Sequence, residues 1–402
     1  MRSLFKATIL VALAVLIAIP PATADDYPIG GRSSMWDDPY IIGSYRHLGE
    51  IYASRPVPRQ GEVTELPRGE QITDFAYDLR GMPRSLEDYF ERARTTGLIV
   101  LKDGKIVYER YRLGADERSL FTSMSVAKSI TSTLMGFAIG DGLIKGVDDP
   151  ISDYLPELKG SGYEGVPIKA ILQMSSGVSF IEDYDSDASD IGRMWGGSLV
   201  ANNIPIRDFV RNIKRTREPF KSFHYAGVEP VALGWLVSRV TGKTLSDYLS
   251  EKMWGPLGME ADANWVTDGR GPEATEAAFC CFNATLRDYA RFGLLMAQDG
   301  VWQGKRLLPA GWVAEATRPD RPQVQPGKLY AGYQMGYQYQ WWTFPGEDHA
   351  FTGQGVNGQF LYVNPAENLV IVMTSVWKDW WSDDLEAQTY AIFDSFATAL
   401  RE

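Results

Sequence analysis

Apolar residues form short, strand-like runs near both ends of the chain. Residues 98–101 and 106–111 flank the turn sequence Asp103-Gly104 and predict a β-hairpin. Further strand-like runs, separated by turn residues, return late in the chain at residues 337–342, 359–363 and 369–374. Both ends of the chain therefore supply strands.

Helical spacing of apolar residues marks most of the remaining chain. Ser85 precedes an amphipathic helix with Leu86, Tyr89 and Phe90 on one face, and residues 383–400 form another. The patterns between about 130 and 315 are mostly helical, with helices at 230–241, at 245–253 and from residue 285.

This order of elements predicts an α+β fold. We expect an antiparallel sheet flanked by helices, built from both termini, with a mostly helical lobe inserted in the middle. Residues 81–130 and 315–402 would form the α/β lobe and residues 131–314 the helical lobe. Residues 25–80 would be an extension that wraps the surface. A site would lie in the cleft between the lobes.

The first 24 residues are typical of a signal peptide. Arg2 and Lys6 precede an uncharged apolar run over residues 7–19, and Ala22-Thr23-Ala24 fits a cleavage site. The run is too short for a good membrane span. We therefore expect cleavage after residue 24 and an exported protein, periplasmic or secreted, that is not membrane-bound.

Charge and rare residues exclude several kinds of partner. Loss of Arg2 and Lys6 changes the net charge from −11 to −13, which argues against nucleic acid or an anionic membrane as partner. The three histidines show no metal-ligand spacing, so neither a metal nor a cofactor is expected. The adjacent Cys280 and Cys281 are expected to be small buried residues, with a vicinal disulfide as the alternative.

The stretch from Ser125 to Lys128 reads S-x-x-K and leads into an apolar helical run. Residues three apart share one face of a helix, so the lysine amine reaches the serine hydroxyl. A desolvated lysine has a lowered pKa and takes the serine proton. Without other support, the motif also fits an exposed helix start with an N-capping serine and a solvated lysine.

Acyl transfer further requires a proton donor for the leaving group and N–H groups for the oxyanion. Tyr225 precedes a predicted buried helix and is a candidate donor, although an aromatic residue there also fits plain core packing. Residues 352–358 are glycine-rich and open a strand. Glycines there would let a substrate backbone approach the sheet edge, or would form an ordinary turn.

In this order and spacing, the three elements resemble the serine β-lactamase and penicillin-recognising family, in its class C and esterase-like branch. The resemblance covers roughly residues 80–400 and implies a β-lactamase-like fold. Supporting blocks are Gly142-Leu143-Ile144 with Asp148-Asp149-Pro150, residues 171–177, Asn283-Ala284-Thr285 and residues 287–293.

Two departures from the family pattern bear on substrate. Lactam-specialised members carry Tyr-x-Asn, but Gly227 stands at the third position here. They also carry Lys-Thr-Gly, whereas the aligned triplet here is Gly353-Gln354-Gly355. The cation that would hold a β-lactam carboxylate is missing, so good β-lactamase activity is not expected. What remains resembles the 6-aminohexanoate-oligomer hydrolases and the carboxylesterases of this fold.

That resemblance implies Ser125 as nucleophile, Lys128 as base and Tyr225 as proton relay. The oxyanion would bind the N–H groups of Ser125 and Val356. The substrate-binding residues implied by position are Tyr184, Asn283, Gln354, Gly355, Val356 and Trp195, with Asn283 near Lys128 or the substrate amide and Trp195 in an aromatic cleft wall.

The sequence thus predicts an exported serine hydrolase of small-molecule esters or amides that acts through an acyl-enzyme. The alternatives are a D-amino-acid peptidase or weak β-lactamase of the same family, and a non-catalytic binding or sensor domain on this scaffold. Intact Ser125, Lys128 and Tyr225 argue against the last.

Overall fold

The computed structural model describes residues 27–401, so the predicted signal peptide lies outside the described residues. At the centre is a seven-stranded antiparallel sheet in the order β11-β12-β13-β14-β15-β4-β5. Its strands are β4 (Thr95–Lys102), β5 (Lys105–Tyr111), β11 (Gly336–Gln338), β12 (Trp341–Thr343), β13 (Phe351–Gly355), β14 (Gln359–Asn364) and β15 (Leu369–Ser375). Early β4 pairs with late β15, which confirms an α+β fold built from both ends.

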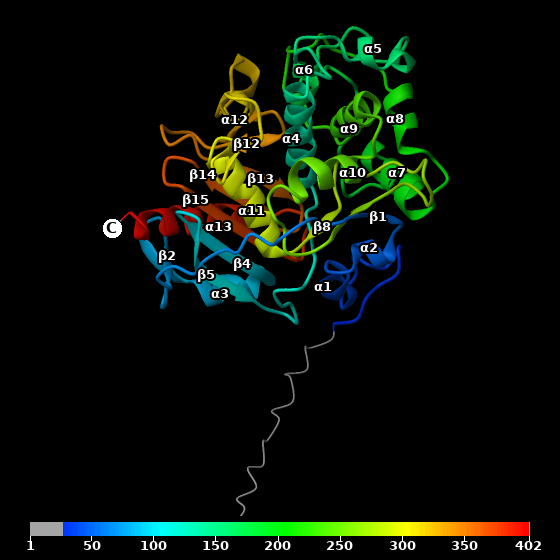
Figure 1. The fold of residues 1–402 in the computed structure, drawn as a ribbon. Helices are drawn as coiled ribbons and strands as arrows, with labels where there is room; N and C mark the ends of the chain where they lie inside the picture. Colours follow the sequence, from blue (N-terminus) through cyan, green and yellow to red (C-terminus); the bar gives the residue numbers. More distant parts are fainter. Residues whose placement is uncertain (1–26, 402) are drawn as a thin grey trace, which may run out of the picture.

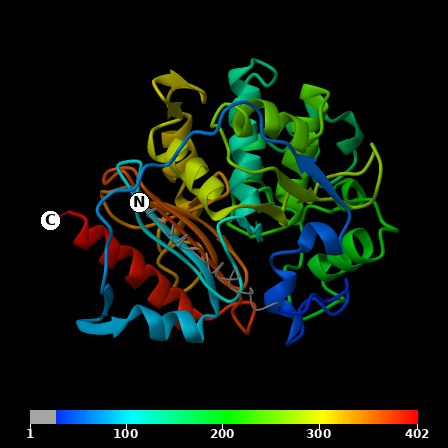
Figure 2. The same ribbon diagram turned by 60° about the horizontal axis from the view of Figure 1, so that its bottom comes forward.

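Helices cover both faces of this sheet (Figures 1 and 2). One face carries α3 (Leu86–Arg92) and α13 (Asp383–Ala399). On that face Phe393 of α13 packs against Phe360 and Tyr362 of β14. The other face carries α4 (Val126–Gly140) and α11 (Leu286–Ala297). The sheet is therefore buried on both sides, as its almost uniformly apolar strands require.

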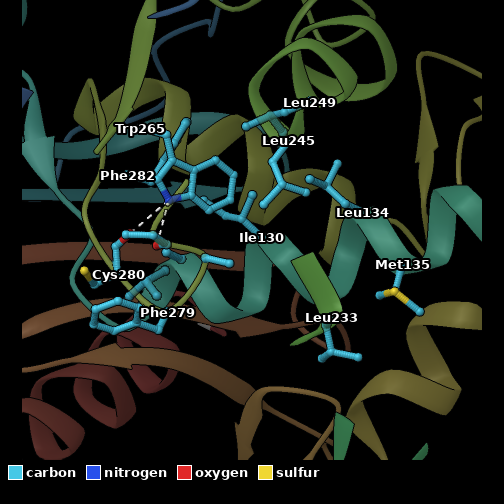
Figure 3. Packing of buried hydrophobic residues seen from close by; sticks show 14 of the residues in the cluster. Ile130, Leu134, Met135, Leu233, Leu245, Leu249, Trp265, Phe279, Cys280 and Phe282 are labelled. Carbon is cyan, nitrogen blue, oxygen red and sulfur yellow. Dashed lines mark hydrogen bonds between the residues drawn. The ribbon is translucent and has the colours of Figure 1, made fainter. Parts of the chain in front are cut away.

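Helix α4 lies between the sheet and the helical lobe (Figure 1). Residues 126–138 of this helix are all buried, because β13 packs on one side and α9 (Val228–Thr241) on another. Figure 3 shows Ile130 and Leu134 of α4 packed among the hydrophobic residues of α10 (Leu245–Leu249). The two polar residues that open this helix, Ser125 and Lys128, are thereby held in a rigid, largely apolar setting.

A second, four-stranded sheet crosses the lobe that the sequence predicts to be mostly helical. Its order is β1-β7-β8-β6, with bounds β1 (Ser54–Val57), β6 (Phe121–Thr122), β7 (Ala263–Val266) and β8 (Phe282–Ala284). Pairing of Thr122 with Asn283 fixes the chain three residues before Ser125. The strands are short and lie far apart in sequence, so their pairing leaves no local signal.

The N-terminal segment is part of the core of the molecule. Met35, Ile41, Tyr45 and Leu48 are buried, and β1 pairs with β7. Helices α1 (Tyr40–Ser44) and α2 (Leu48–Ile51) belong to this segment, which continues into the hairpin of β2 (Ala76–Leu79) and β3 (Met82–Ser85).

The remaining elements are short. They are α5 (Ile151–Tyr154), α6 (Ile168–Leu172), α7 (Asp190–Met194), α8 (Ile206–Asn212), α12 (Trp312–Thr317), β9 (Val301–Trp302), β10 (Lys305–Arg306), the π-helices Trp195–Val200 and Ser250–Trp254, and the 3₁₀-helices Pro156–Leu158 and Pro322–Val324. Between residues 27 and 401, no helix is long and apolar enough to cross a membrane.

One predicted strand is wrong in detail. Residues 337–342 form two strands, β11 and β12, because the chain reverses at Tyr339 and Gln340. Both residues have positive φ, 35° and 67°, which no sequence rule expects of tyrosine and glutamine.

Candidate active site

Ser125 stands at the N-cap of α4, but its hydroxyl does not cap the helix. Met124 before it has φ +40°, a left-handed backbone that turns the chain sharply from β6 into the helix. Two bonds to β8 hold this turn: Ser123 N donates to Phe282 O at 2.7 Å, and Phe282 N donates to Ser123 Oγ at 3.0 Å. The Ser125 hydroxyl is therefore left for Lys128, whose Nζ donates to Ser125 Oγ at 2.8 Å.

Lys128 is buried, with 1% of its surface exposed. Its Nζ donates to Phe279 O at 2.9 Å and lies 4.9 Å from the ring centroid of Tyr225. Burial lowers the pKa of Lys128 to about 8, and the negative charge of Glu182 opposes that decrease. Roughly a tenth of this amine is therefore neutral at pH 7 and most of it above pH 8, and the neutral form is the one that acts as a general base.

Tyr225 lies just before α9, with its ring stacked on Trp342 at 5.7 Å. Burial raises the pKa of Tyr225 most strongly, the charge of Glu182 raises it further, and a hydrogen bond with Ser125 opposes both. Tyr225 is therefore a phenol at neutral pH, a form suited to give a proton to a leaving group.

Glu182 is the site residue that the sequence analysis missed. Gly227 N donates to Glu182 Oε2 at 2.7 Å, and Tyr184 Oη donates to Oε1 at 2.6 Å. A Cβ at Gly227 would lie 3.2 Å from Oε2, so this carboxylate occupies space that a side chain at position 227 would need. Glu182 thus gives a physical reason for glycine at the third position of Tyr225-Ala226-Gly227. In the sequence it is one acid among several in the stretch 182–190, and nothing local distinguishes it.

Strand β13 lies against the start of α4. A Cβ at Gly355 would stand 2.7 Å from Ser123 O and 2.9 Å from Ser125 N, so only glycine fits this backbone contact. Val356 follows directly. Asn357 comes next with φ +58° and is anchored on both sides: Tyr45 Oη donates to its Oδ1 at 2.6 Å, and its Nδ2 donates to Trp377 O at 2.9 Å.

The structure brings Tyr184 to this site and directs Gln354 away from it. Ser125 is among the hydrogen-bonding groups that act on the pKa of Tyr184, which burial raises well above its ordinary range. Gln354 lies on the opposite face of β13 from Gly353 and Gly355, and its Nε2 donates to Tyr390 Oη of α13 at 2.6 Å.

Asn283 and Trp195 both contact the segment 279–281, whose Phe279 carbonyl accepts a hydrogen bond from Lys128. Asn283 Nδ2 donates to Asn264 Oδ1 at 2.8 Å and to Cys281 O at 3.1 Å, and its Oδ1 is buried without a partner among the described residues. Trp195 packs edge-on against Phe279 at 6.5 Å, and Phe279 supplies the carbonyl bound by Lys128.

Other aromatic residues extend from Tyr184 and Trp195 toward solvent and toward the N-terminal segment. Trp380 lies 5.0 Å from Tyr184 and is 40% exposed. Trp36 and Tyr52 of the N-terminal segment pack on Trp195 at 5.2 and 5.6 Å. Within residues 27–401, no group of three or more His, Cys, Asp or Glu residues is placed to hold a metal ion.

Comparison with known proteins finds relatives that match most of the chain. The chain is 29% identical over 354 residues to a 6-aminohexanoate-dimer hydrolase from Paenarthrobacter ureafaciens, covering 86% of this chain and 88% of the relative. A solved structure from Bacillus anthracis with the provisional name 6-aminohexanoate-dimer hydrolase superposes with a TM-score of 0.82 at 26% identity, covering 92% of this chain and 97% of that one.

A third comparison reaches the same fold at lower identity. EstCE1, a hydrolase with promiscuous acyltransferase activity, has a TM-score of 0.62 and 15% identity over 77% of this chain and 96% of its own. The family model described as Beta-lactamase matches residues 84–393, which is most of the chain. The protein therefore belongs to the β-lactamase family of hydrolytic enzymes.

Proposed function

We propose that the protein is an exported serine hydrolase that cleaves ester or amide bonds through an acyl-enzyme on Ser125. The observation that carries the proposal is the 2.8 Å contact between Lys128 Nζ and Ser125 Oγ, made by a lysine whose pKa burial lowers to about 8. In its neutral form the amine accepts the serine proton across the same contact.

The reaction then runs in two halves. Ser125 Oγ bonds to the substrate carbonyl carbon while its proton passes to Lys128, and the N–H groups of Ser125 and Val356 bind the oxyanion. The carbonyl re-forms as the bond to the leaving group breaks. Tyr225 gives its phenolic proton to that group and regains one from Lys128. In the second half, a water molecule gives a proton to Lys128 as its oxygen bonds to the acyl carbon. The bond from that carbon to Ser125 Oγ then breaks, the proton returns to Ser125 through the same pair, and the acid is released.

The strand beside the serine lacks the cation that lactam-specialised relatives offer to a substrate carboxylate. Gly353 stands where lactam-specialised relatives carry a lysine, and a Cβ there would already lie 3.0 Å from Val126 Cγ1. No cation is therefore offered to a substrate carboxylate at that position. Together with the similarity to 6-aminohexanoate-dimer hydrolases, this supports esters and non-peptide amides as the substrate class.

A burst experiment tests the proposal. The mature protein, Ser125→Ala and Ser132→Ala would be mixed with p-nitrophenyl butyrate. Ser132 lies two turns along the same helix, is buried and has no hydrogen-bond partner among the described residues, so it is a matched control. We expect a burst equal to the enzyme concentration in wild type and Ser132→Ala, and a loss of at least about a thousandfold in Ser125→Ala. Equal turnover by all three proteins would refute the proposal.

The substrate class is tested with the same three proteins. Ser125-dependent release of 6-aminohexanoate from its linear dimer, with slow or no opening of nitrocefin, is the expected result. Efficient nitrocefin hydrolysis would contradict the proposed preference and favour a β-lactamase.

A further inference from the structure

Cys280 and Cys281 are joined by a disulfide between neighbouring residues. Both are buried, at 4% and 0% exposure. The disulfide stands between two carbonyls that hold the start of α4: Phe279 O accepts from Lys128 Nζ, and Phe282 O accepts from Ser123 N. It thus occupies the stretch of chain that joins the supports of the proposed base and nucleophile.

The whole segment 277–282 is a row of occupied hydrogen-bond acceptors. Trp265 Nε1 donates to Ala277 O at 3.0 Å and to Cys280 O at 2.9 Å, a pairing visible in Figure 3. Thr131 of α4 donates to Ala278 O at 3.1 Å. The direction of the Phe279 carbonyl is therefore set by the backbone path of this segment, and among residues 27–401 Lys128 is the side chain that binds it.

The backbone at the disulfide has a conformation that an open chain disfavours. Cys281 has φ +66°, in the left-handed region that side chains with a Cβ rarely adopt. A covalent ring across Cys280 and Cys281 restricts the peptide between them. When the ring opens, Cys281 regains access to extended backbone, and the chain next to Phe279 is free to shift.

We propose that the Cys280–Cys281 disulfide is a positioning element that holds the Phe279 carbonyl, and through it Lys128, in the catalytic arrangement. The inference rests on the proposed function. Reduction by a dithiol adds two electrons and two protons to the disulfide, gives two thiols and leaves the reductant as a cyclic disulfide. The reduced enzyme then loses the fixed acceptor that orients the amine toward Ser125.

Opening of the disulfide is expected to lower the rate of the chemical step and to leave substrate binding unchanged. Because Cys280 and Cys281 are the two cysteines of the chain, a thiol count reports this pair alone. We expect the reduced enzyme, and Cys280→Ser/Cys281→Ser, to lose about tenfold or more in kcat with little change in KM, as expected when a general base is misoriented. Reoxidation restores the wild type only.

The pH profile of kcat/KM distinguishes a misplaced Lys128 from a nonspecific loss of structure. Lys128 faces Ser125, the ring of Tyr225 and the charge of Glu182. Loosening the segment admits water to the amine, so the limb of kcat/KM that rises near pH 8 moves to higher pH. Cys280→Ser/Cys281→Gly suits the positive φ without a disulfide and is expected to recover part of the loss. This variant also serves if the double serine variant does not fold.

A reduced protein or a folded disulfide-free variant with unchanged kcat and unchanged pH profile would overturn the inference. Absence of Ser125-dependent turnover in the oxidised enzyme would instead refute the proposed function. In that case NMR titration of ¹⁵N-labelled lysine, with Lys128→Met for assignment, decides the inference: the Lys128 signal should titrate at higher pH after reduction, and an unmoved titration contradicts it.

Discussion

Tyr45 donates a 2.6 Å hydrogen bond to Asn357, 312 residues further along the chain. Both residues are buried. Asn357 directly follows Val356, one of the two proposed oxyanion donors, and Tyr45 O also accepts from Thr122 N of β6 at 3.2 Å. One tyrosine of the N-terminal segment thus braces both chain segments that meet at the proposed nucleophile.

Tyr45→Phe is expected to lower kcat about tenfold with little change in KM, because a displaced Val356 N–H would stabilise the oxyanion of the transition state less well. Steady-state kinetics with a p-nitrophenyl ester measures the effect. Tyr40→Phe is the control and should match wild type, because Tyr40 opens helix α1, of which Tyr45 is the C-cap, and is 37% exposed. Equal kcat for both variants would show that Tyr45 does not act on the oxyanion site.

The pH dependence of kcat/KM should follow the Lys128 amine. The active form is the neutral amine, and the pKa of Lys128 is about 8. Activity therefore rises about tenfold per pH unit below that value and levels off above it. A profile measured from pH 6 to 10 checks this. A limb near pH 10.5, the ordinary value for lysine, would mean that the amine is solvated.

Removal of the Glu182 charge should move that limb to lower pH. Glu182 raises the pKa of Lys128, so Glu182→Gln favours the neutral amine at a given pH. The neighbouring, exposed Asp187→Asn serves as control for loss of one negative charge. The pH profile of kcat/KM, measured for both variants, shows whether the limb moves only when Glu182 is replaced. If the limb does not move in Glu182→Gln, or moves equally in both variants, the charge of Glu182 does not act specifically on the pKa of Lys128.

Gly355→Ala is expected to reduce kcat at least about a hundredfold, because its Cβ would push β13 away from the Ser125 N–H and open the oxyanion site. The backbone atoms Ser123 O and Ser125 N lie 2.7 and 2.9 Å from that Cβ. Gly146→Ala is the matched control, since nothing lies within 4 Å of its Cβ. Acylation rates measured by stopped flow compare the two. Full activity in Gly355→Ala would exclude the tight contact.

The parts of the molecule that follow local rules were predictable from the sequence. Apolar runs bounded by turn residues predicted β4, β5, β14 and β15, and the spacing of Ser125 and Lys128 placed both on one helical turn. Strand alternation also explains Gln354: the glycines on either side face Ser125, so its own side chain must face α13.

Features that depend on contacts between distant parts of the chain could not be predicted from local sequence patterns. The sheet β1-β7-β8-β6 joins strands of two to four residues from distant parts of the chain. Glu182 is distinguished only by its bonds to Gly227 and Tyr184. The sequence left the state of Cys280 and Cys281 open, because adjacency alone does not decide between two thiols and a bridge.

The pairing of β4 with β15 has a consequence for biosynthesis. These strands are neighbours in the sheet, yet Leu98 and its partner Met373 lie 275 residues apart in the sequence. The ribosome makes β4 long before β15. The hairpin of β4 and β5 therefore lacks its neighbouring strand β15 until most of the chain has been synthesised. Folding of the central sheet is therefore a late event in the synthesis of the chain.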